Sequence, residues 1–139
     1  MQISYKAIYA VKAVIYVASY KGSKLCTITE IAESEKVPRE FLAKILKELT
    51  QRGILRSYRG VQGGYKLAKP ESEISFLDII EAVQERFNRI RHPGPAEEHK
   101  VYKGASFVFW QELYDLVENK LATKKLDSLN YAQFYQHAK

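Results

Sequence analysis

An amphipathic segment from Arg39 to Arg52 sharply limits the folds open to this chain. At about 100° per residue, the step of an α-helix, its apolar residues fill one continuous arc and its charged and polar residues fill the other. Pro38 precedes the segment and suits a helix start, and Gly53 follows its end. We therefore expect a helix with one face in the core and the other free to contact a partner. The predicted core face holds Phe41, Leu42, Ile45, Leu46 and Leu49.

A shorter helix is predicted directly before this segment. Thr27 and Glu30 have the spacing of a capping box, in which each side chain bonds the backbone N–H of the other residue. The helix runs from Ile28 to about Glu35, and Val37-Pro38 separates it from the next one. Two helices joined by a short turn, the second with a basic outer face, are typical of a helix-turn-helix.

The chain opens with a predicted long helix over residues 3–20, closed by Gly22. Four tyrosines form one stripe along it. Such a stripe is typical of packing with the hydroxyl groups at the rim, and a role in binding a ligand or phosphate is the alternative. The tyrosines are Tyr5, Tyr9, Tyr16 and Tyr20.

A Gly-rich loop follows the helix-turn-helix. Ile54 to Arg59 and Tyr65 to Lys69 are predicted as short strands, with Gly60-Val61-Gln62-Gly63-Gly64 between them. Small residues let a backbone approach another surface closely, and flanking arginines suit a narrow minor groove, although turn geometry alone also explains the glycines. The loop lacks the Lys-Ser/Thr ending of a phosphate loop, which excludes nucleotide binding of that kind. A helix-turn-helix followed by a basic hairpin is a winged helix.

The charge distribution agrees with a nucleic-acid-binding half. Of the 22 Lys and Arg and 16 Asp and Glu in 139 residues, residues 1–70 hold 13 basic and 5 acidic ones, and residues 71–139 hold 9 and 11. A basic half joined to a mildly acidic half indicates a nucleic-acid-reading module attached to something else. A Lys-rich solvated surface is the simpler alternative.

The second half is predicted to be helical. A capping box at Ser75 and Asp78 opens a helix to about Phe87, and residues 88–105 are polar and irregular, which predicts a mobile loop. A helix from Phe107 to about Leu121 follows, and Leu126 to Lys139 is predicted as a terminal helix. The helix from Phe107 to Leu121 carries a broad apolar stripe that needs a partner to cover it, and a second copy of the chain is the economical partner. The predicted dimerisation residues are Phe107, Trp110, Leu113, Tyr114, Val117 and Leu121.

These elements predict a mainly α (α+β) fold, a winged helix-turn-helix with a C-terminal dimerisation helix. We expect a DNA-binding domain over residues 1–85, a flexible loop over 86–105, and the dimerisation helix with a helical tail over 106–139. There is no run of apolar residues long enough to span a membrane and no signal-peptide layout, so we expect a cytoplasmic protein.

The ordered motifs resemble one family. Ile28-Thr29-Glu30-Ile31-Ala32-Glu33, the apolar positions of residues 41–55, Arg59 to Ala68, and Ile74 to Val83 are similar to the bacterial winged-helix transcription regulators that include IscR, NsrR and CymR. The resemblance is close over residues 1–85 and weaker beyond. It implies a homodimeric regulator, which we expect to be a repressor, on a palindromic operator in double-stranded DNA. It places the recognition helix in the major groove and the wing in the minor groove.

The DNA contacts implied by the resemblance lie on the recognition helix and the wing. Lys47 and Arg56 are added from the polar face of the helix and the basic hairpin. Ala43 stands where several relatives carry Glu, which removes an acceptor for cytosine N4, so the operator need not match theirs. The full predicted set is Arg39, Glu40, Ala43, Lys44, Lys47, Arg56, Ser57, Arg59, Gly60, Gln62 and Gly63.

The chain departs from the family at the expected cofactor site. Many relatives hold an iron–sulfur cluster through three cysteines in the loop before the dimer helix, whereas the matching loop here, residues 92–99, has none. We therefore predict no cluster and no cofactor. A packing role is the simpler interpretation of Cys26, the single cysteine, and redox sensing is its alternative. A divalent metal site is a further alternative to exposure for His92, Glu97, Glu98 and His99.

Two other classes of function compete with a DNA-binding regulator. The sequence has no nucleophile–base pair, no paired catalytic carboxylates and no nucleotide loop, so an enzyme is not expected. A winged-helix adaptor that contacts proteins is the main alternative to a DNA-binding regulator. Without a cluster, the regulator is expected to respond to a small molecule or a partner protein. We expect a ligand pocket at the aromatic junction of the first helix, the loop and Trp110.

Overall fold

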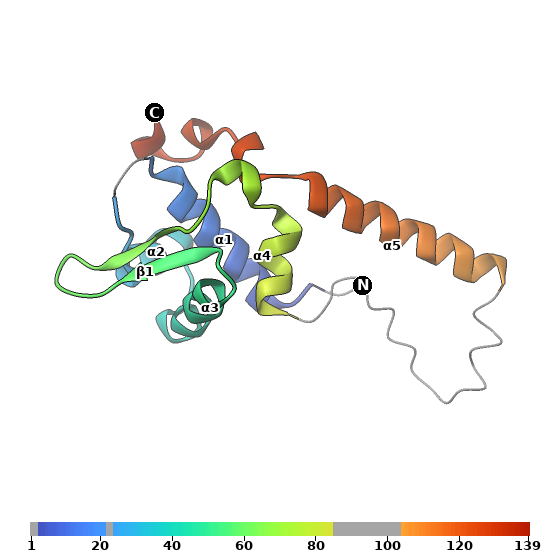
Figure 1. Cartoon of the computed structure of the whole chain (residues 1–139), viewed down its shortest axis with the longest axis horizontal. Helices are drawn as coiled ribbons and strands as arrows, with labels where there is room; N and C mark the ends of the chain where they lie inside the picture. The colour runs from blue at the N-terminus through green and yellow to red at the C-terminus, as the bar shows by residue number, and fades with distance from the viewer. Residues whose placement is uncertain (1–2, 22–23, 85–103) are drawn as a thin grey trace.

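The computed structural model describes residues 3–21, 24–84 and 104–139. Five α-helices and one antiparallel hairpin account for most of the described residues (Figure 1). In chain order these elements are α1 (Tyr5–Ser19), α2 (Ile28–Glu35), α3 (Arg39–Gln51), β1 (Leu55–Tyr58), β2 (Gly64–Leu67), α4 (Phe76–Val83) and α5 (Ala105–Thr123). The predicted winged helix is confirmed.

The core is built around α1, which contacts α2, α3, α4 and β2. Three alanines spaced three residues apart on α1 are fully buried, namely Ala7, Ala10 and Ala13. Their small side chains let the neighbouring helices approach the α1 backbone, and larger residues of those helices fill the space between. The buried side chains opposite are Ile31 of α2, Leu42, Ile45, Leu46 and Leu49 of α3, and Ile79 and Ile80 of α4.

The helix starts follow the predicted caps. At α4 both halves of the capping box form, with Asp78 N donating to Ser75 Oγ and Ser75 N donating to Asp78 Oδ2, each at 3.0 Å. At α2 one half forms, because Thr27 Oγ1 accepts from Glu30 N at 3.2 Å. The Glu30 carboxylate instead lies 3.4 Å from Lys24 Nζ. The predicted second half of the box, in which this carboxylate accepts from the backbone N–H of Thr27, is therefore wrong.

Two predicted helix ends need correction. The first helix stops at Ser19, and Gly22 lies outside the described residues. The helix predicted to reach Phe87 stops at Val83. Gln84 takes an extended conformation there, and its side-chain oxygen accepts bonds from the backbone N and the Oγ of Ser4 at 3.1 and 3.0 Å. This contact ties the end of α4 to the start of α1.

The hairpin is anchored to the segment before α2. Leu55 pairs with Leu67 and Tyr58 with Gly64 in the β1–β2 register. Cys26 forms a bridge to Tyr65 on the other edge of β2, with N–O distances of 2.9 and 2.8 Å. Both edges of β2 are therefore paired near its start, and the wing is attached to the helix-turn-helix by backbone bonds.

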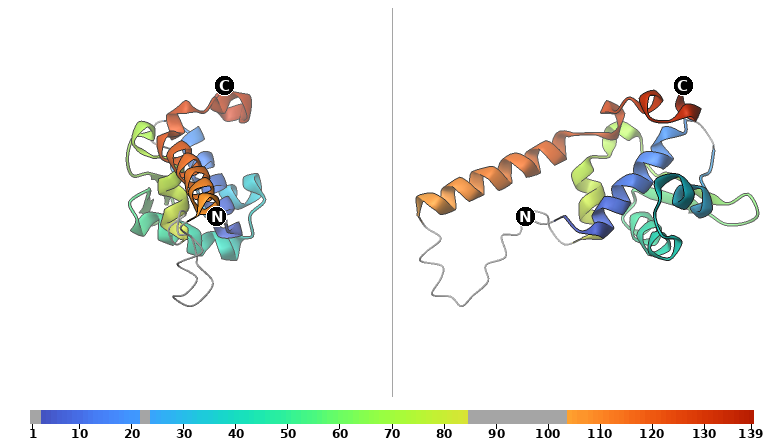
Figure 2. Two further views of the ribbon diagram at one scale, coloured as in Figure 1. Left: turned by 90° about the vertical axis from the view of Figure 1, so that its right-hand side faces the viewer. Right: turned by 180° about the vertical axis from the view of Figure 1, so that it is seen from behind.

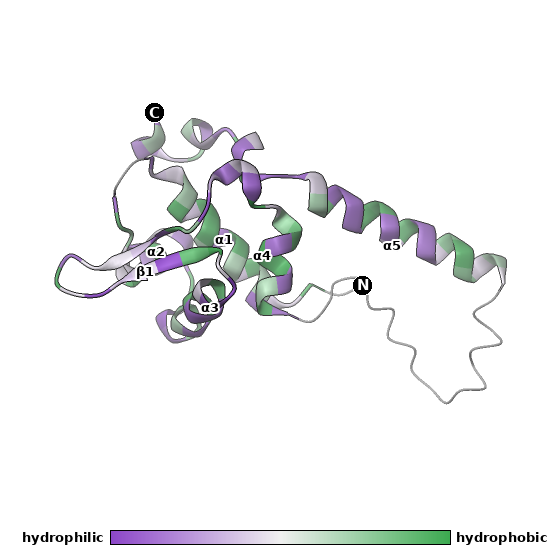
Figure 3. Cartoon of the chain, in the orientation of Figure 1, coloured by the Kyte–Doolittle hydropathy of each residue, from purple (hydrophilic) through white to green (hydrophobic). Residues whose placement is uncertain are grey.

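Helix α5 projects from the packed body (Figures 1 and 2). It touches α4, and its C-terminal end is held where Phe76 N donates to Lys124 O at 3.0 Å and Leu126 N donates to Ile74 O at 3.1 Å. None of its residues is buried. Hydrophobic and hydrophilic bands alternate along its length (Figure 3).

The predicted terminal helix over residues 126–139 is wrong. Three separate 3₁₀ turns, Leu126–Ser128, Tyr131–Gln133 and Gln136–Ala138, replace it. The segment folds back on the ends of α1 and α2, where Tyr135 Oη donates to Glu35 Oε1 at 2.6 Å and His137 bonds Ser19 Oγ at 2.7 Å. These tertiary contacts bend the backbone away from a regular helix.

Candidate nucleic-acid interface

The outer face of α3 is exposed along its whole length. Helix α3 buries four of the five apolar residues predicted for its core face. The exception is Phe41, which lies at the edge of the apolar arc and is 61% exposed. All five residues of α3 predicted to contact DNA are exposed, as expected for the recognition helix of a helix-turn-helix. They are Arg39, Glu40, Ala43, Lys44 and Lys47.

An ion pair helps to orient this face. Lys6 Nζ of α1 lies 2.5 Å from Glu48 Oε1 of α3, and both side chains are partly exposed. Glu48 is therefore engaged on the α1 side of α3. Lys44 and Lys47 of the outer face make no ion pair within the described ranges. Their charge is available to an anionic partner such as a phosphate backbone.

The hairpin presents two different faces. Because side chains alternate along a strand, Arg56 and Tyr58 share the face that lies away from Leu55, together with Lys66 opposite Arg56. Lys66 Nζ lies 5.0 Å from the centre of the Tyr58 ring. Hydrogen bonds from Lys66 and Arg56 lower the pKa of the Tyr58 hydroxyl. The predicted contact Ser57 is exposed but lies on the opposite face, with Leu55 and Tyr65.

The loop of the wing requires glycine at two positions. Gly63 N donates to Gly60 O at 2.9 Å, which closes the turn. A Cβ on Gly63 would collide with the carbonyl oxygen of Tyr58, and a Cβ on Gly64 would come within 2.7 Å of the carbonyl oxygen of Cys26. Gly64 also has a φ of +155°. The glycines therefore set the path of the loop and present Arg59 and Gln62, which are both exposed.

The wing and α3 lie at the same end of the molecule, opposite the free end of α5, and the front and back views agree (Figures 1 and 2). The exposed cations of this end come from both elements, and Glu40 is the acidic residue among the predicted contacts. None of these cations is ion-paired within residues 3–21, 24–84 and 104–139. A surface with this charge and a protruding helix is able to bind a polyanion. The cations are Arg39, Lys44, Lys47, Arg56 and Arg59.

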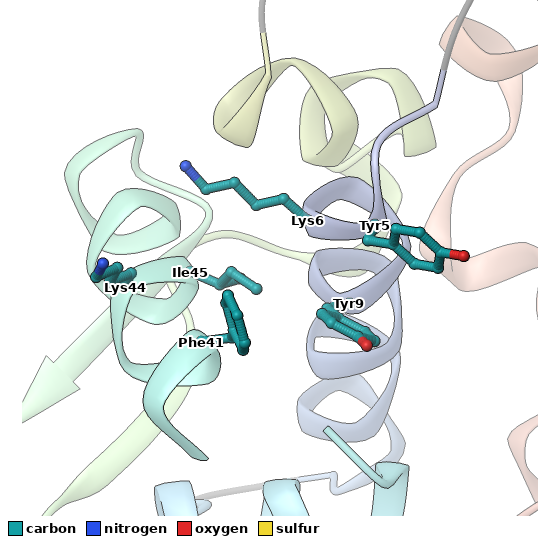
Figure 4. A pocket seen from close by; sticks show the side chains of 6 residues that line it. All are labelled: Tyr5, Lys6, Tyr9, Phe41, Lys44 and Ile45. Carbon is teal, nitrogen blue, oxygen red and sulfur yellow. The ribbon is translucent and has the colours of Figure 1, made fainter. Parts of the chain in front are cut away.

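An open groove of about 540 Å³ lies beside the contact between α1 and α3, and we call it the α1–α3 groove (Figure 4). Trp110, predicted to belong to a ligand pocket with the first helix, does not line this groove, because it sits on the projecting α5. The loop of that prediction lies outside the described residues. The groove is lined by Tyr5, Lys6, Tyr9, Phe41, Lys44 and Ile45.

Cys26 is unsuited to sensing from the surface. The side chain is fully buried, and burial together with the Glu30 carboxylate raises the pKa of the thiol to about 12. A protonated, enclosed thiol is a poor nucleophile and a poor metal ligand. This environment agrees with the packing role preferred on sequence grounds.

The donor set does not fit a thiolate-held iron–sulfur cluster. The chain has one cysteine, and such clusters need several thiolates. Among the described residues, no group of three or more His, Cys, Asp or Glu side chains is placed to hold a metal ion. The alternative site around His92 and His99 lies outside the described residues.

The apolar stripe of α5 divides into two parts. Val117 and Leu121, near its C-terminal end, pack against the core of the same chain. Trp110, toward the other end, is 49% exposed, while Phe107, Leu113 and Tyr114 are partly exposed. Sequence reasoning missed further exposed apolar residues, although Phe109 and Leu116 are seven residues apart and share a stripe. These are Val108, Phe109 and Leu116, which are exposed by 51%, 56% and 67%.

Two other residues were missed at the interface. Tyr58 could have been found from strand alternation, since it falls two residues after Arg56. Phe41 could have been recognised from its place at the edge of the apolar arc of α3.

Among the described helices, none combines the length and apolarity needed to cross a membrane.

A helix-turn-helix with a basic outer face and a basic, Gly-rich hairpin beside it define a winged-helix DNA-binding protein. Residues 3–132 match the family model Rrf2, described as iron-dependent transcriptional regulators. The chain belongs to the Rrf2 family, and the resemblance seen in the sequence is confirmed. Members of this family regulate transcription and are not enzymes.

Curated relatives and solved structures agree with this assignment. The HTH-type transcriptional regulator IscR of Cereibacter sphaeroides is 32% identical over 96 residues, which cover 68% of this chain and 61% of that protein. The chain spans 50% to 58% of the length of relatives from Mycobacterium tuberculosis, Aquifex aeolicus and Rhizobium meliloti.

Two solved structures share the fold over nearly the whole chain. CymR of Staphylococcus aureus superposes with a TM-score of 0.73 at 28% identity, covering 95% of this chain and 98% of that one. CymR of B. subtilis, the global cysteine regulator of that organism, superposes with a TM-score of 0.77 at 24% identity, covering 91% of this chain and 94% of that one. The second match supports the fold alone.

Proposed function

We propose that this protein is a cytoplasmic repressor that binds a palindromic operator as a homodimer. Helix α3 enters the major groove, and the tip of the wing enters the neighbouring minor groove. The observation that carries the proposal is the joint placement of the exposed outer face of α3 and the basic wing at one end of the molecule (Figure 1). The width of a major groove suits one α-helix, and arginines such as Arg59 suit a narrow minor groove.

Helix α5 is the proposed dimerisation element. Most of the stability of a helix comes from packing of its apolar face, yet the 19 residues of α5 include none that is buried, and exposed apolar faces of this kind mark contact surfaces. A second copy is the economical partner, because a two-fold axis lets one stripe cover its equivalent and gives the assembly the symmetry of a palindrome. Phe109, Trp110 and Leu116 are the exposed residues expected to contribute most.

The proposed regulator works without an iron–sulfur cluster and responds to a small molecule or a partner protein. The support is the single, buried Cys26. The family description names iron dependence for the group, and this chain departs from it in its ligand set. Purified protein is expected to lack the visible absorption of a cluster when isolated without oxygen.

The test is selection from genomic DNA. Purified protein is bound to fragments of DNA from its source organism, the retained fragments are sequenced, and the best one is titrated against salt. We expect a two-fold symmetric site and an affinity that falls with a log–log slope of about 0.9 per phosphate neutralised. Weak binding without sequence preference, with and without candidate effectors, would contradict the proposal and favour a winged helix that contacts proteins.

A further inference from the structure

The α1–α3 groove has the size and lining of a small-molecule site. Its volume of about 540 Å³ lies within the range of about 300–1,000 Å³ typical of ligand pockets. Phe41 and Tyr9 project from opposite helices and lie on facing sides of the groove, with Ile45 beside Phe41 (Figure 4). Phe41 is 61% exposed, so a large apolar ring borders the groove without being covered by the core. These walls suit a flat aromatic ring system.

The polar groups of the groove favour an anion. Lys6 lines it but is paired with Glu48 at 2.5 Å, so its charge is already balanced. Lys44 borders the groove from the outer side of α3, where its ammonium lies away from Phe41 and Tyr9 (Figure 4), and it makes no ion pair with any described residue. The hydroxyl group of Tyr9 is an additional hydrogen-bond donor on the opposite wall, whereas the Tyr5 hydroxyl is directed away from α3 (Figure 4). A carboxylate attached to an aromatic ring would pair with Lys44, while Lys6 stays paired with Glu48.

The same lysine belongs to the predicted DNA-contacting face. Lys44 is exposed on α3 and lies within the set that we expect to contact the operator. A ligand carboxylate that holds Lys44 removes one cation from the DNA surface. Coupling between two ligands is reciprocal, so a compound that weakens DNA binding is itself bound less tightly by the DNA complex.

We propose that the α1–α3 groove binds an aromatic carboxylate of about two fused rings, and that the bound acid weakens operator binding by engaging Lys44. The ring system lies between Phe41 and Tyr9, and the Lys44 side chain turns over the rim of the groove from the outer side of α3 to meet the carboxylate. The second half of this inference rests on the proposed function, because it requires a DNA-binding regulator. The binding of the acid to the free protein does not.

The experiment uses 2-naphthoate as the probe and the full chain as the protein. Binding is measured by calorimetry, with the neutral naphthalene-2-carboxamide as a ligand control. We expect saturable binding of the acid and at least about tenfold weaker binding of the amide, because the amide lacks the charge that Lys44 recognises. Absence of saturable naphthoate binding at millimolar concentrations would overturn the inference.

Matched variants locate the site. Phe41→Ala and Lys44→Gln should each weaken naphthoate binding by about tenfold or more, since one removes a wall and the other the cation. Phe134→Ala removes a ring that is 71% exposed outside the groove, and Lys47→Gln removes a neighbouring cation of α3 that does not line it. Both controls should bind naphthoate like the parent protein. Equal binding by the parent and Phe41→Ala would overturn the inference.

The DNA readout separates this inference from the proposed function. Saturating naphthoate should weaken operator affinity of the parent by about tenfold, whereas Lys47→Gln weakens operator affinity and keeps its response to naphthoate. Operator binding that is intact and unaffected by naphthoate would overturn the inference and leave the proposed function standing. If the protein binds naphthoate but no operator is found, the groove stands as a ligand site and the proposal of a DNA-binding regulator is refuted.

Discussion

Helices α1 and α5 have similar lengths and opposite environments. Helix α1 spans 15 residues and buries eight of them at the centre of the domain, whereas α5 spans 19 and buries none. Both carry apolar stripes, so amphipathicity alone does not distinguish a core helix from an interface helix. The difference lies in the neighbours, because α1 is enclosed by four elements and α5 rests on α4 near one end. Helix α5 therefore has an apolar surface that the other described residues leave exposed.

The largest effect is expected from a core variant of the enclosed region. Leu46→Ala removes a fully buried side chain of α3 and should lower the free energy of unfolding by about 2–5 kcal/mol, because it leaves a cavity beside α1. Urea denaturation measures the loss. The matched change on α5, Leu116→Ala, removes a side chain that is 67% exposed and should chiefly weaken self-association in sedimentation experiments. Similar losses in the dilute monomer would contradict the contrast between the two helices.

Charge reversal sharpens the comparison at the DNA-binding end. Lys44→Glu and Arg59→Glu should each cost about 1–3 kcal/mol of operator binding, because they turn attraction to DNA into repulsion. Fluorescence anisotropy at fixed salt measures the change. Lys139→Glu, an equal reversal at an exposed lysine outside α3, the wing and α5, is the control and should keep the operator affinity. If the Lys44→Glu and Arg59→Glu variants bind the operator as tightly as this control does, the DNA interface does not lie on α3 and the wing.

The buried thiol predicts a dependence of stability on alkaline pH. The pKa of Cys26 is about 12 in the folded chain and lies near 9 in the unfolded chain. The unfolded state therefore loses its proton first as the pH rises, and the folded state is destabilised above about pH 9. We expect a total decrease of about 1.4 kcal/mol in the free energy of unfolding between pH 8 and 10, because the unfolded thiol ionises over this range and the folded one does not. Urea unfolding at pH 8, 9 and 10 measures this decrease.

Cys26→Ala is the matched control for that slope. It removes the titrating group, so its stability should vary less between pH 8 and 10 than that of the parent. Alkylation by iodoacetamide gives an independent reading, since the native thiol should react far more slowly than the thiol in urea. Fast alkylation of the native protein would show that Cys26 is accessible.

The smallest effect is expected at the C-terminal segment. His137 stacks on Tyr20 with ring centres 3.7 Å apart and bonds the buried Ser19. His137→Ala should cost about 1 kcal/mol of unfolding free energy, because the stack and one hydrogen bond are lost. Phe134→Ala in the same segment is the control, as its ring is mostly exposed. Equal thermal unfolding of the two variants would indicate that the segment does not stabilise the domain.

Local signals predicted the winged-helix part of the chain well. The capping residues Ser75 and Asp78, the core face of α3 and the hairpin around Gly63 depend on residues close in the sequence. Their physical causes, backbone caps and side-chain periodicity, operate over one or two turns. The exposed α3 residues and the tip of the wing could be placed from these signals, and their roles on DNA remain predictions.

Long-range contacts decided the rest. His137 and Ser19 are 118 residues apart, and their bond helps to hold the last residues in 3₁₀ turns that periodicity had predicted as one helix. Gln84 ends α4 through Ser4 in the same way. The α1–α3 groove joins Tyr9 to Phe41 across two helices, and nothing local in the sequence indicates that these rings face one another.

Methylation protection on the selected operator tests the central claim most directly. Dimethyl sulfate modifies guanine N7 in the major groove and adenine N3 in the minor groove, so one experiment reads both grooves. We predict two symmetric half-sites with N7 protected by α3 and N3 protected beside them by the wing. Lys44→Ala should reduce the first protection and Arg59→Ala the second. Protection confined to one groove, or a single half-site without symmetry, would contradict a dimer that reads DNA with both elements.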